Sequence, residues 1–372
     1  MTLLARAREL EAGGADIVHM EIGEPDFPTA APVREAGRQA LADGRTGYQP
    51  AAGLPALREA IAGHYQRDHG VEVDPGRILI TPGASGALLV ALAMLADPGR
   101  NVLLPDPGYP CNRNFVEAVD ATPRAVRVDA GSDYQLTPGL AAAACDERTA
   151  AMLVGSPGNP TGTLASAADL AGLAALGQRR GIGLIVDEIY HGLHYDGAPA
   201  QALAHAPDAI VVNSFSKYFG MTGWRLGWMV VPADWVPVAQ KLLQNLFISA
   251  STPAQYAALA CFTEASREIF EARREAFRQR RDFLLPALRD LGFHIPGNPA
   301  GAFYLYADIT ALGDDSADLA SGLLEQDGVA MTPGLDFERT APERHLRFAY
   351  TTDTDRLATA VSRIQRYLAA GG

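Results

Sequence analysis

Residues 209–227 read AIVVNSFSKYFGMTGWRLG, an apolar run followed by a polar, glycine-containing segment. The run at 209–213 is rich in β-branched residues, as in a buried strand. Lys217 comes four residues after it. In an open α/β sheet, ligands bind beyond the carboxyl ends of the strands. The stretch therefore predicts a functional site at the point where this strand ends.

Similar runs recur along the chain, with helical segments between them. They lie at residues 77–81, 101–104, 124–128, 151–154, 183–187 and 226–231. Strands that alternate with helices predict a mainly parallel sheet covered by helices on both faces. The helix expected at 87–95 is apolar on every side and should be buried.

The sequence changes character near residue 271, where an Arg/Glu-rich helix begins. Alternating strands at 301–306 and 346–350 and a closing helix at 355–369 follow. We therefore expect an α/β fold with a large domain at residues 38–271. The segments 1–37 and 272–372 should form a smaller α+β domain.

Composition excludes several classes of protein. The 372 residues carry a formal net charge of −12, which disfavours nucleic acid and anionic membranes as partners. Residues 1–10 carry charges where a signal peptide needs an apolar run, so we expect a cytoplasmic protein. Cys111, Cys145 and Cys261 are odd in number and widely spaced, and so predict no disulfide framework.

Two segments could hold a phosphate group. Ser214 and Arg225 flank Lys217 with a hydroxyl and a guanidinium, and arginine suits tetrahedral oxyanions. The segment TPGASGALL at 81–89 places small residues at the start of a helix, where backbone N–H groups favour an anion.

The sequences Ser-Phe-Ser-Lys at 214–217 and Gly-Trp-Arg-Leu-Gly at 223–227 resemble the active-site signature of class I and II aminotransferases. The similarity runs from about residue 9 to the C-terminus and is greatest to aspartate/aromatic-type enzymes of fold type I. It implies pyridoxal 5'-phosphate as cofactor, with Lys217 as the Schiff-base lysine. The resemblance assigns the cofactor phosphate to Ala84, Ser85, Ser214, Ser216 and Arg225.

Further residues of the resemblance surround the cofactor ring. Asp187 ends an apolar strand, and a buried carboxylate is rare unless it is paired. The resemblance implies that Asp187 keeps the pyridine nitrogen protonated and that Tyr190 bonds to the phenolic oxygen. Asn159, in an Asn-Pro-Thr-Gly motif, would contact the same oxygen, and Tyr109 would stack on the ring.

Substrate contacts are expected from both ends of the chain. The resemblance places the backbone of Gly23 and the side chains of Asn159 and Arg347 at the substrate, with Arg347 binding its carboxylate. Tyr48 resembles a tyrosine that reaches the phosphate of the neighbouring subunit, which implies a homodimer with shared active sites. The side chain of the amino acid substrate stays open.

The predicted function is transfer of an amino group from an L-amino acid to a 2-oxo acid by a ping-pong mechanism. One alternative is a carbon–sulfur β-lyase on the same scaffold. Another is a ligand-sensing module like the aminotransferase-like half of certain transcription regulators. His191 and His194 have no third ligand nearby in the sequence, so no metal is expected.

Overall fold

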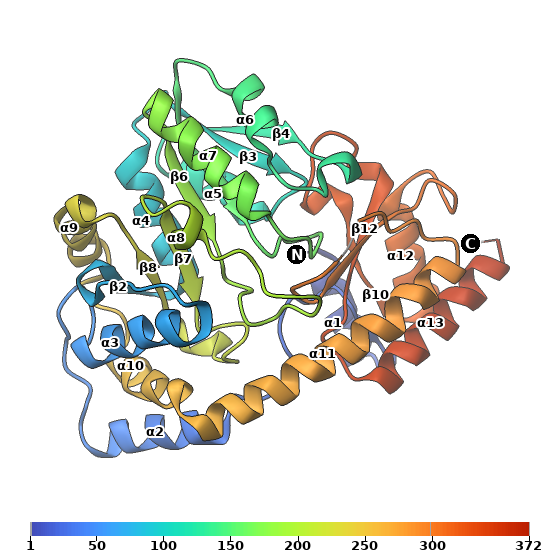
Figure 1. Ribbon diagram of the computed structural model, residues 1–372. Coiled ribbons are helices and arrows are strands. Elements are labelled where there is room, and N and C mark those ends of the chain that lie inside the picture. The colour runs from blue at the N-terminus through green and yellow to red at the C-terminus, as the bar shows by residue number, and fades with distance from the viewer. Residues whose placement is uncertain (1, 298, 372) are drawn as a thin grey trace.

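The computed structural model describes residues 2–297 and 299–371. This part of the chain contains a seven-stranded sheet in the order β2-β8-β7-β6-β5-β3-β4 (Figure 1). Strand β8 runs antiparallel to both neighbours, and the pairs from β7 to β4 are parallel. The expected mainly parallel sheet is therefore confirmed. The strands are β2 (Ile78–Thr81), β3 (Asn101–Asp106), β4 (Thr122–Arg127), β5 (Thr149–Gly155), β6 (Gly183–Asp187), β7 (Ile210–Ser214) and β8 (Gly227–Val230).

Helices cover both faces of this sheet. Successive strand residues point to opposite faces, so neighbouring residues join different core clusters. Ile185 joins a core cluster with α4 and α9, whereas Val186 joins a second cluster with α3, α7 and α10. The covering helices are α2 (Ala31–Ala42), α3 (Pro55–His64), α4 (Gly83–Leu95), α5 (Pro110–Ala118), α6 (Pro138–Ala144), α7 (Ala167–Arg180), α8 (Ala202–His205), α9 (Val236–Phe247) and α10 (Thr252–Leu259). As predicted from its apolar sequence, α4 is largely buried.

The smaller unit combines the two ends of the chain. Strand β1 pairs with β10, and the second sheet has the order β11-β12-β9. Helices α1, α12 and α13 pack around them, at the right of Figure 1. The elements are α1 (Thr2–Ala12), β1 (Val18–His19), β9 (Tyr304–Asp308), α12 (Ser316–Asp327), β10 (Val329–Ala330), β11 (Thr332–Pro333), β12 (His345–Ala349) and α13 (Thr354–Ala369).

Strand β9 begins at Tyr304 and not at 301, where the sequence pattern placed it. Gly301 donates its N–H to Gly162, and Ala302 donates to Leu193 with a positive φ of 58°. These bonds tie residues 301 and 302 to loops of the large sheet instead of the small one. The alternating pattern could not distinguish these two sets of partners.

Helix α11 (Glu264–Asp290) connects the two units along the lower side of Figure 1. Its residue Phe270 belongs to the core of the large sheet, whereas Phe277 belongs to the core of the smaller unit. The expected domain boundaries at 37/38 and 271/272 fall inside α2 and α11, and they stay a prediction. Within residues 2–297 and 299–371, no helix has both the length and the apolar run needed to cross a bilayer.

Candidate active site

The polar residues of interest lie at the carboxyl edge of the large sheet. Asp187 is the last residue of β6 and pairs with Gly155 at the end of β5. Strand β7 ends at Ser214, and Lys217 follows three residues later. The parallel strands therefore bring segments that are far apart in sequence to one edge.

The Lys217 amine is directed at the N-terminal segment. Its Nζ donates to the carbonyl oxygen of Gly23 at 2.7 Å. Burial lowers the pKa of the amine to about 8, with the positive charges of Arg347 and Arg225 acting in the same direction and Glu24 opposing them. A substantial fraction of the amine is therefore neutral near pH 8, as a nucleophile requires.

Asp187 is a buried carboxylate with few internal partners. Its Oδ1 accepts the backbone N–H of Ile189 at 3.1 Å, and burial raises its pKa to about 6. In the part of the chain that the structure describes, it forms no ion pair, and the charge of Lys217 lowers its pKa only slightly against the effect of burial. A ligand that carries a positive charge would supply the missing partner.

An anion cradle forms where β7, β8 and α4 meet. Helix α4 begins at Gly83 without a side-chain cap, so its first N–H groups remain available. A Cβ atom added to Gly83 would lie 2.9 Å from the Arg225 guanidinium, so this cation lies against the helix start. Ala84 and Ser85 occupy the first turn.

The serines after β7 complete this cradle. Ser214 Oγ donates to Ser216 Oγ at 2.9 Å and accepts the N–H of Ser216 at 3.1 Å, so the two hydroxyls lie side by side. Gly227 is required nearby, because a Cβ there would lie 2.9 Å from the nitrogen of Ala84. Two hydroxyls, an arginine and a helix N-terminus are suitable ligands for a phosphate dianion.

Arg347 lies buried between two aromatic rings. Its guanidinium is 4.3 Å from the Tyr304 ring centre and 4.6 Å from that of Phe337. It donates to Asn159 Oδ1 at 3.1 Å and to the carbonyl of Glu21 at 2.7 Å. Its Nε is buried without a partner, so the group has a donor in reserve for a ligand.

The three predicted tyrosines are placed differently. Tyr190 is buried, and its hydroxyl lies 2.9 Å from that of Tyr304. Tyr109 precedes α5 and is partly exposed. Tyr48, between α2 and α3, is 80% exposed, and no contact with the other predicted site residues is seen in the described part of this chain.

Sequence reasoning missed Tyr304 and Phe337 as residues of the site. Tyr304 lies in the strand expected at 301–306, and Phe337 lies in a segment for which no element was predicted. Their signal is positional, because β9 and β12 are antiparallel neighbours and bring Tyr304 beside Arg347. Register between distant strands is not readable from one sequence.

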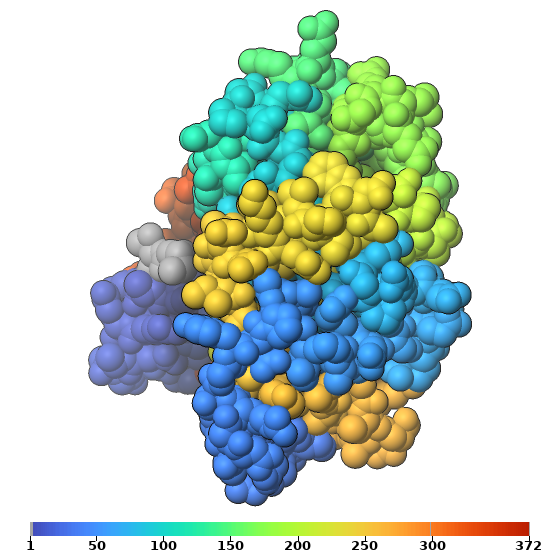
Figure 2. Space-filling view, turned by 90° about the vertical axis from the view of Figure 1, so that its left-hand side faces the viewer, coloured from blue at the N-terminus to red at the C-terminus, as the bar shows by residue number. Residues whose placement is uncertain are grey.

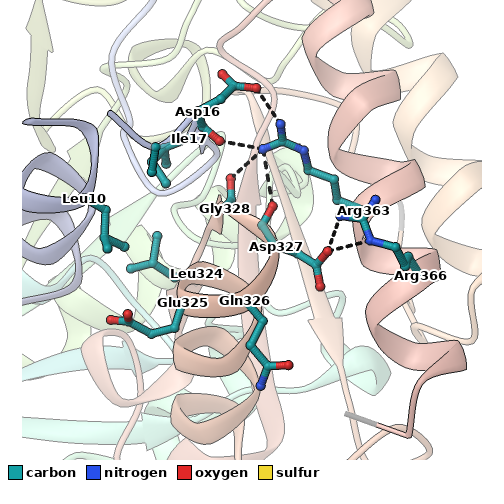
Figure 3. Close-up of a pocket in the computed structure, with 11 residues that line it drawn as sticks. Leu10, Asp16, Ile17, Leu324, Glu325, Gln326, Asp327, Gly328, Arg363 and Arg366 are labelled. Carbon is teal, nitrogen blue, oxygen red and sulfur yellow. Dashed lines mark hydrogen bonds and ion pairs between the residues drawn. The ribbon is translucent and has the colours of Figure 1, made fainter. Parts of the chain in front are cut away.

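Two other regions do not add to the site. His191 and His194 belong to no group of three or more metal-ligating side chains among the described residues. A shallow pocket of about 360 Å³ lies between α1, α12 and α13, and no predicted site residue lines it (Figure 3). Its walls carry ion pairs such as that of Arg366 with Asp327.

Comparisons with known proteins show similarity over nearly the whole chain. Residues 15–364 match the family model described as aminotransferase class I and II. The valine–pyruvate aminotransferase of Mycobacterium tuberculosis is 36% identical over 371 residues, which cover 99% of this chain and 95% of the relative. The aspartate/prephenate aminotransferase of Thermus thermophilus is 37% identical over 367 residues, with 98% and 94% covered.

Solved structures extend the similarity to three dimensions. A crystal structure of an aminotransferase from Mycobacterium tuberculosis superposes with a TM-score of 0.96 at 36% identity, covering 100% of this chain and 96% of the other. Sequence and fold agree over nearly the whole length. The chain therefore belongs to the class I and II aminotransferase family and is a transaminase.

Proposed function

We propose that this aminotransferase uses pyridoxal 5'-phosphate and moves the amino group of an L-amino acid to a 2-oxo acid through Lys217. The observation that carries the proposal is the pair of buried groups at the sheet edge. Lys217 has a pKa lowered to about 8 by burial, and Asp187 is a buried carboxylate that forms no ion pair with a described residue. An amine reactive near neutral pH and a carboxylate that needs a cation fit the aldehyde and the pyridinium of this cofactor.

The remaining residues would hold the cofactor and the substrate. Ser214, Ser216, Arg225 and the first amides of α4, from Ala84 and Ser85, would hold the phosphate. Tyr190 and Asn159 would donate to the phenolic oxygen, and Tyr109 would cover the ring. Arg347 would bind the substrate carboxylate beside the backbone of Gly23, and its unpaired Nε supports this role.

The chain's own groups then act in a fixed order. When bound, the cofactor supplies a carbonyl that takes up the amino group and a ring that withdraws electrons from Cα. Arg347 orients the amino acid, and the Lys217 amine takes the Cα proton and returns it as a general acid. The 2-oxo acid product leaves before the acceptor binds, which gives ping-pong kinetics.

A homodimer is part of the proposal. Tyr48, Val238, Leu246 and Ile248 are large apolar side chains exposed to solvent. Their segments lie on one face, where the blue and yellow parts of Figure 2 adjoin, and Thr252 Oγ1 donates to the Gly47 carbonyl at 2.6 Å between them. An apolar surface of this kind marks a protein interface. Measurement of the molecular mass in solution tests the homodimer. The cytoplasmic location also stays a prediction.

The decisive experiment uses the low lysine content of the chain. Besides Lys217, the sequence contains one lysine, Lys241, which is exposed on α9. Protein supplied with pyridoxal phosphate should absorb visible light and, after borohydride reduction, carry the adduct at Lys217. Lys217→Ala should lower turnover by at least about 1,000-fold, because it removes both the nucleophile and the proton carrier. Lys241→Arg is the matched control and should keep the adduct at position 217.

The same protein then identifies the substrates. A panel of amino acid donors should be assayed with 2-oxoglutarate and with pyruvate as acceptors, including valine and aspartate because the relatives' names contain them. Release of pyruvate and ammonia from cystathionine without any 2-oxo acid would instead favour the β-lyase. A colourless protein without an adduct would reject the proposal.

A further inference from the structure

Tyr304, the first residue of β9, contacts two sides of the candidate site at once. Its side chain is 1% exposed. Its hydroxyl lies 2.9 Å from the hydroxyl of Tyr190, and its ring centre lies 4.3 Å from the guanidinium of Arg347. One side chain therefore contacts both the residue proposed for the cofactor oxygen and the residue proposed for the substrate carboxylate.

The hydroxyl of Tyr304 is also closely packed against the N-terminal segment. A Cβ atom on Gly23 would lie 2.2 Å from this oxygen, a distance that no real contact allows. The carbonyl of Gly23 in turn accepts the Lys217 amine at 2.7 Å. Only glycine leaves room for the hydroxyl, so the position of the hydroxyl is tightly determined.

The direction of the hydrogen bond between the two tyrosines matters for chemistry. A neutral phenol has one proton to donate. If Tyr190 donated it to Tyr304, no proton would remain for a cofactor oxygen. If Tyr304 is the donor, the proton of Tyr190 is free to point into the site.

The proposed role of Tyr190 requires Tyr304 as the donor, because a Tyr190 that gives its one proton to the cofactor oxygen can only accept from Tyr304. Burial raises the pKa of the Tyr304 hydroxyl, and both the guanidinium stacked on its ring and the hydrogen bond with Tyr190 offset part of that rise. Burial raises the pKa of Tyr190 well above its usual value, and the hydrogen bond with Tyr304 adds to the increase. The Tyr304 hydroxyl is fixed in place for this bond, because Arg347 stacks on its ring and Gly23 packs against its oxygen.

We propose that Tyr304 is a positioning residue with two separable roles. Its hydroxyl donates to Tyr190 and so directs the Tyr190 proton to the phenolic oxygen of the cofactor. Its ring, with that of Phe337 opposite, holds Arg347 in the plane where it receives the substrate carboxylate. The inference rests on the proposed function and goes beyond it, because it assigns a role to a residue outside the expected signature.

Removing only the hydroxyl should affect the cofactor side alone. In Tyr304→Phe, Tyr190 becomes a weaker donor, so the phenolic oxygen keeps more negative charge. The nitrogen that joins Lys217 to the cofactor then holds its proton more tightly. The midpoint of the pH titration of visible absorbance should rise by about 0.5 to 1 pH unit, and kcat should fall about 3- to 10-fold. The KM for the amino acid should change less than about twofold, because the ring remains.

Removing the ring should affect both sides. Tyr304→Leu should give the same rise of the midpoint and should also raise the KM for the amino acid about 5- to 10-fold, because Arg347 loses one of its two aromatic neighbours. The difference in KM between Tyr304→Phe and Tyr304→Leu distinguishes a positioning role from a general loss of packing. A merely structural role would alter KM and kcat together in both.

Controls come from the same strand and from the partner tyrosine. Tyr306 lies two residues further along β9, and its hydroxyl donates to Glu338 at 3.1 Å. Tyr306→Phe removes a buried hydroxyl without touching Tyr190 and should leave the midpoint unchanged. In Tyr190→Phe, adding Tyr304→Phe should move the midpoint no further, because Tyr304 acts through Tyr190.

Each outcome of this experiment has a meaning. A Tyr304→Phe holoenzyme with the wild-type midpoint would overturn the inference, as would a midpoint shift that persists at full size in the Tyr190→Phe background. If Tyr304→Phe failed to fold, the single variant Tyr190→Phe would still have to raise the midpoint. A wild-type protein that gains no absorbance with pyridoxal phosphate would reject the proposed function itself, which is a separate result.

Discussion

Two regions of this molecule differ in whether their charged side chains form ion pairs. In the candidate site, Asp187 at the end of β6 and Arg347 on β12 of the smaller unit are buried, and neither forms an ion pair with another described residue. At the terminal seam, formed by residues 10–21, 324–330 and 356–366, the charges form ion pairs. Asp16 binds both Arg356 and Arg363 there. Arg363 also donates to the carbonyl of Gly328 (Figure 3).

The difference separates charges that serve stability from charges that serve a ligand. A surface ion pair loses little hydration and contributes little to the stability of the fold. A buried charge without a partner lowers that stability. Such a charge is retained only where a ligand supplies the missing partner. Substitutions should therefore have large effects on activity at the sheet edge and small effects on stability at the terminal seam.

The largest contrast is expected for Asp187→Asn. Loss of the negative charge should lower kcat/KM by about 100-fold or more, because the cofactor ring would lose its electrostatic partner. Cofactor-free protein should nevertheless become more stable, by about 1 to 3 kcal/mol at pH 7, since burial raises the pKa of Asp187 to about 6 and penalises its ionised form.

The sign of this stability effect can be checked by pH. A carboxyl whose pKa is raised in the folded state binds its proton more tightly there, so wild-type stability should fall as pH rises from about 4 to 6. The difference in the free energy of unfolding between Asp187→Asn and wild type should therefore grow in that interval and stay constant above it. Urea unfolding of both proteins at several pH values measures it. An Asn variant less stable than wild type at pH 7 would contradict the interpretation.

An intermediate effect is expected for His19→Gln at the terminal seam. His19 lies between Glu21, at 2.6 Å, and Glu11, at 3.0 Å. The hydrogen bond to Glu21, opposed by partial burial and reinforced by the bond to Glu11, raises the pKa of His19 to about 9. Its stabilising effect should be full below about pH 6.5 and lost as pH rises to 9, with a size of about 1 kcal/mol because solvent screens the pair.

Thermal unfolding at two pH values tests this second prediction. The difference between wild type and His19→Gln should be visible at pH 6 and absent above pH 9, while kcat changes little. A difference that is equal at both pH values would show that the ring contributes through packing and not through its charge.

The smallest effect is expected for Asp16→Asn. The carboxylate of Asp16 is exposed, and its bonds with Arg356 and Arg363 compete with water. The melting temperature should fall by no more than about 2 °C, and less in about 0.5 M salt, because exposed pairs are screened. Activity should stay at the wild-type level. A large loss of activity would mean that the terminal seam and the sheet edge are coupled.

Much of the fold was readable because its signals are local. Apolar runs at 183–187 and 209–213 predicted β6 and β7 to within one residue, and the all-round apolar sequence of α4 predicted its burial. Lys217, Asp187 and the phosphate-binding segment at 81–89 could be identified as candidates for the same reason, because each follows or ends an apolar run. Their catalytic roles are the proposals made above.

Other features depended on pairing between distant segments. The late start of β9 follows from hydrogen bonds of Gly301 and Ala302 to loops at 162 and 193. The contact of Tyr304 with Tyr190 joins residues 114 positions apart. Neither is encoded in a periodicity, because a strand pattern specifies which side chains share a face and not which partner they meet.

The sequence by itself determined where the strands end and which reactive groups follow them, since apolar periodicity and short motifs are properties of neighbouring residues. Only the tertiary structure decided which of these groups are buried without partners and which aromatic rings surround Arg347. Burial and hydrogen bonding depend on packing between elements, and packing determines the acidity of Lys217 and Asp187.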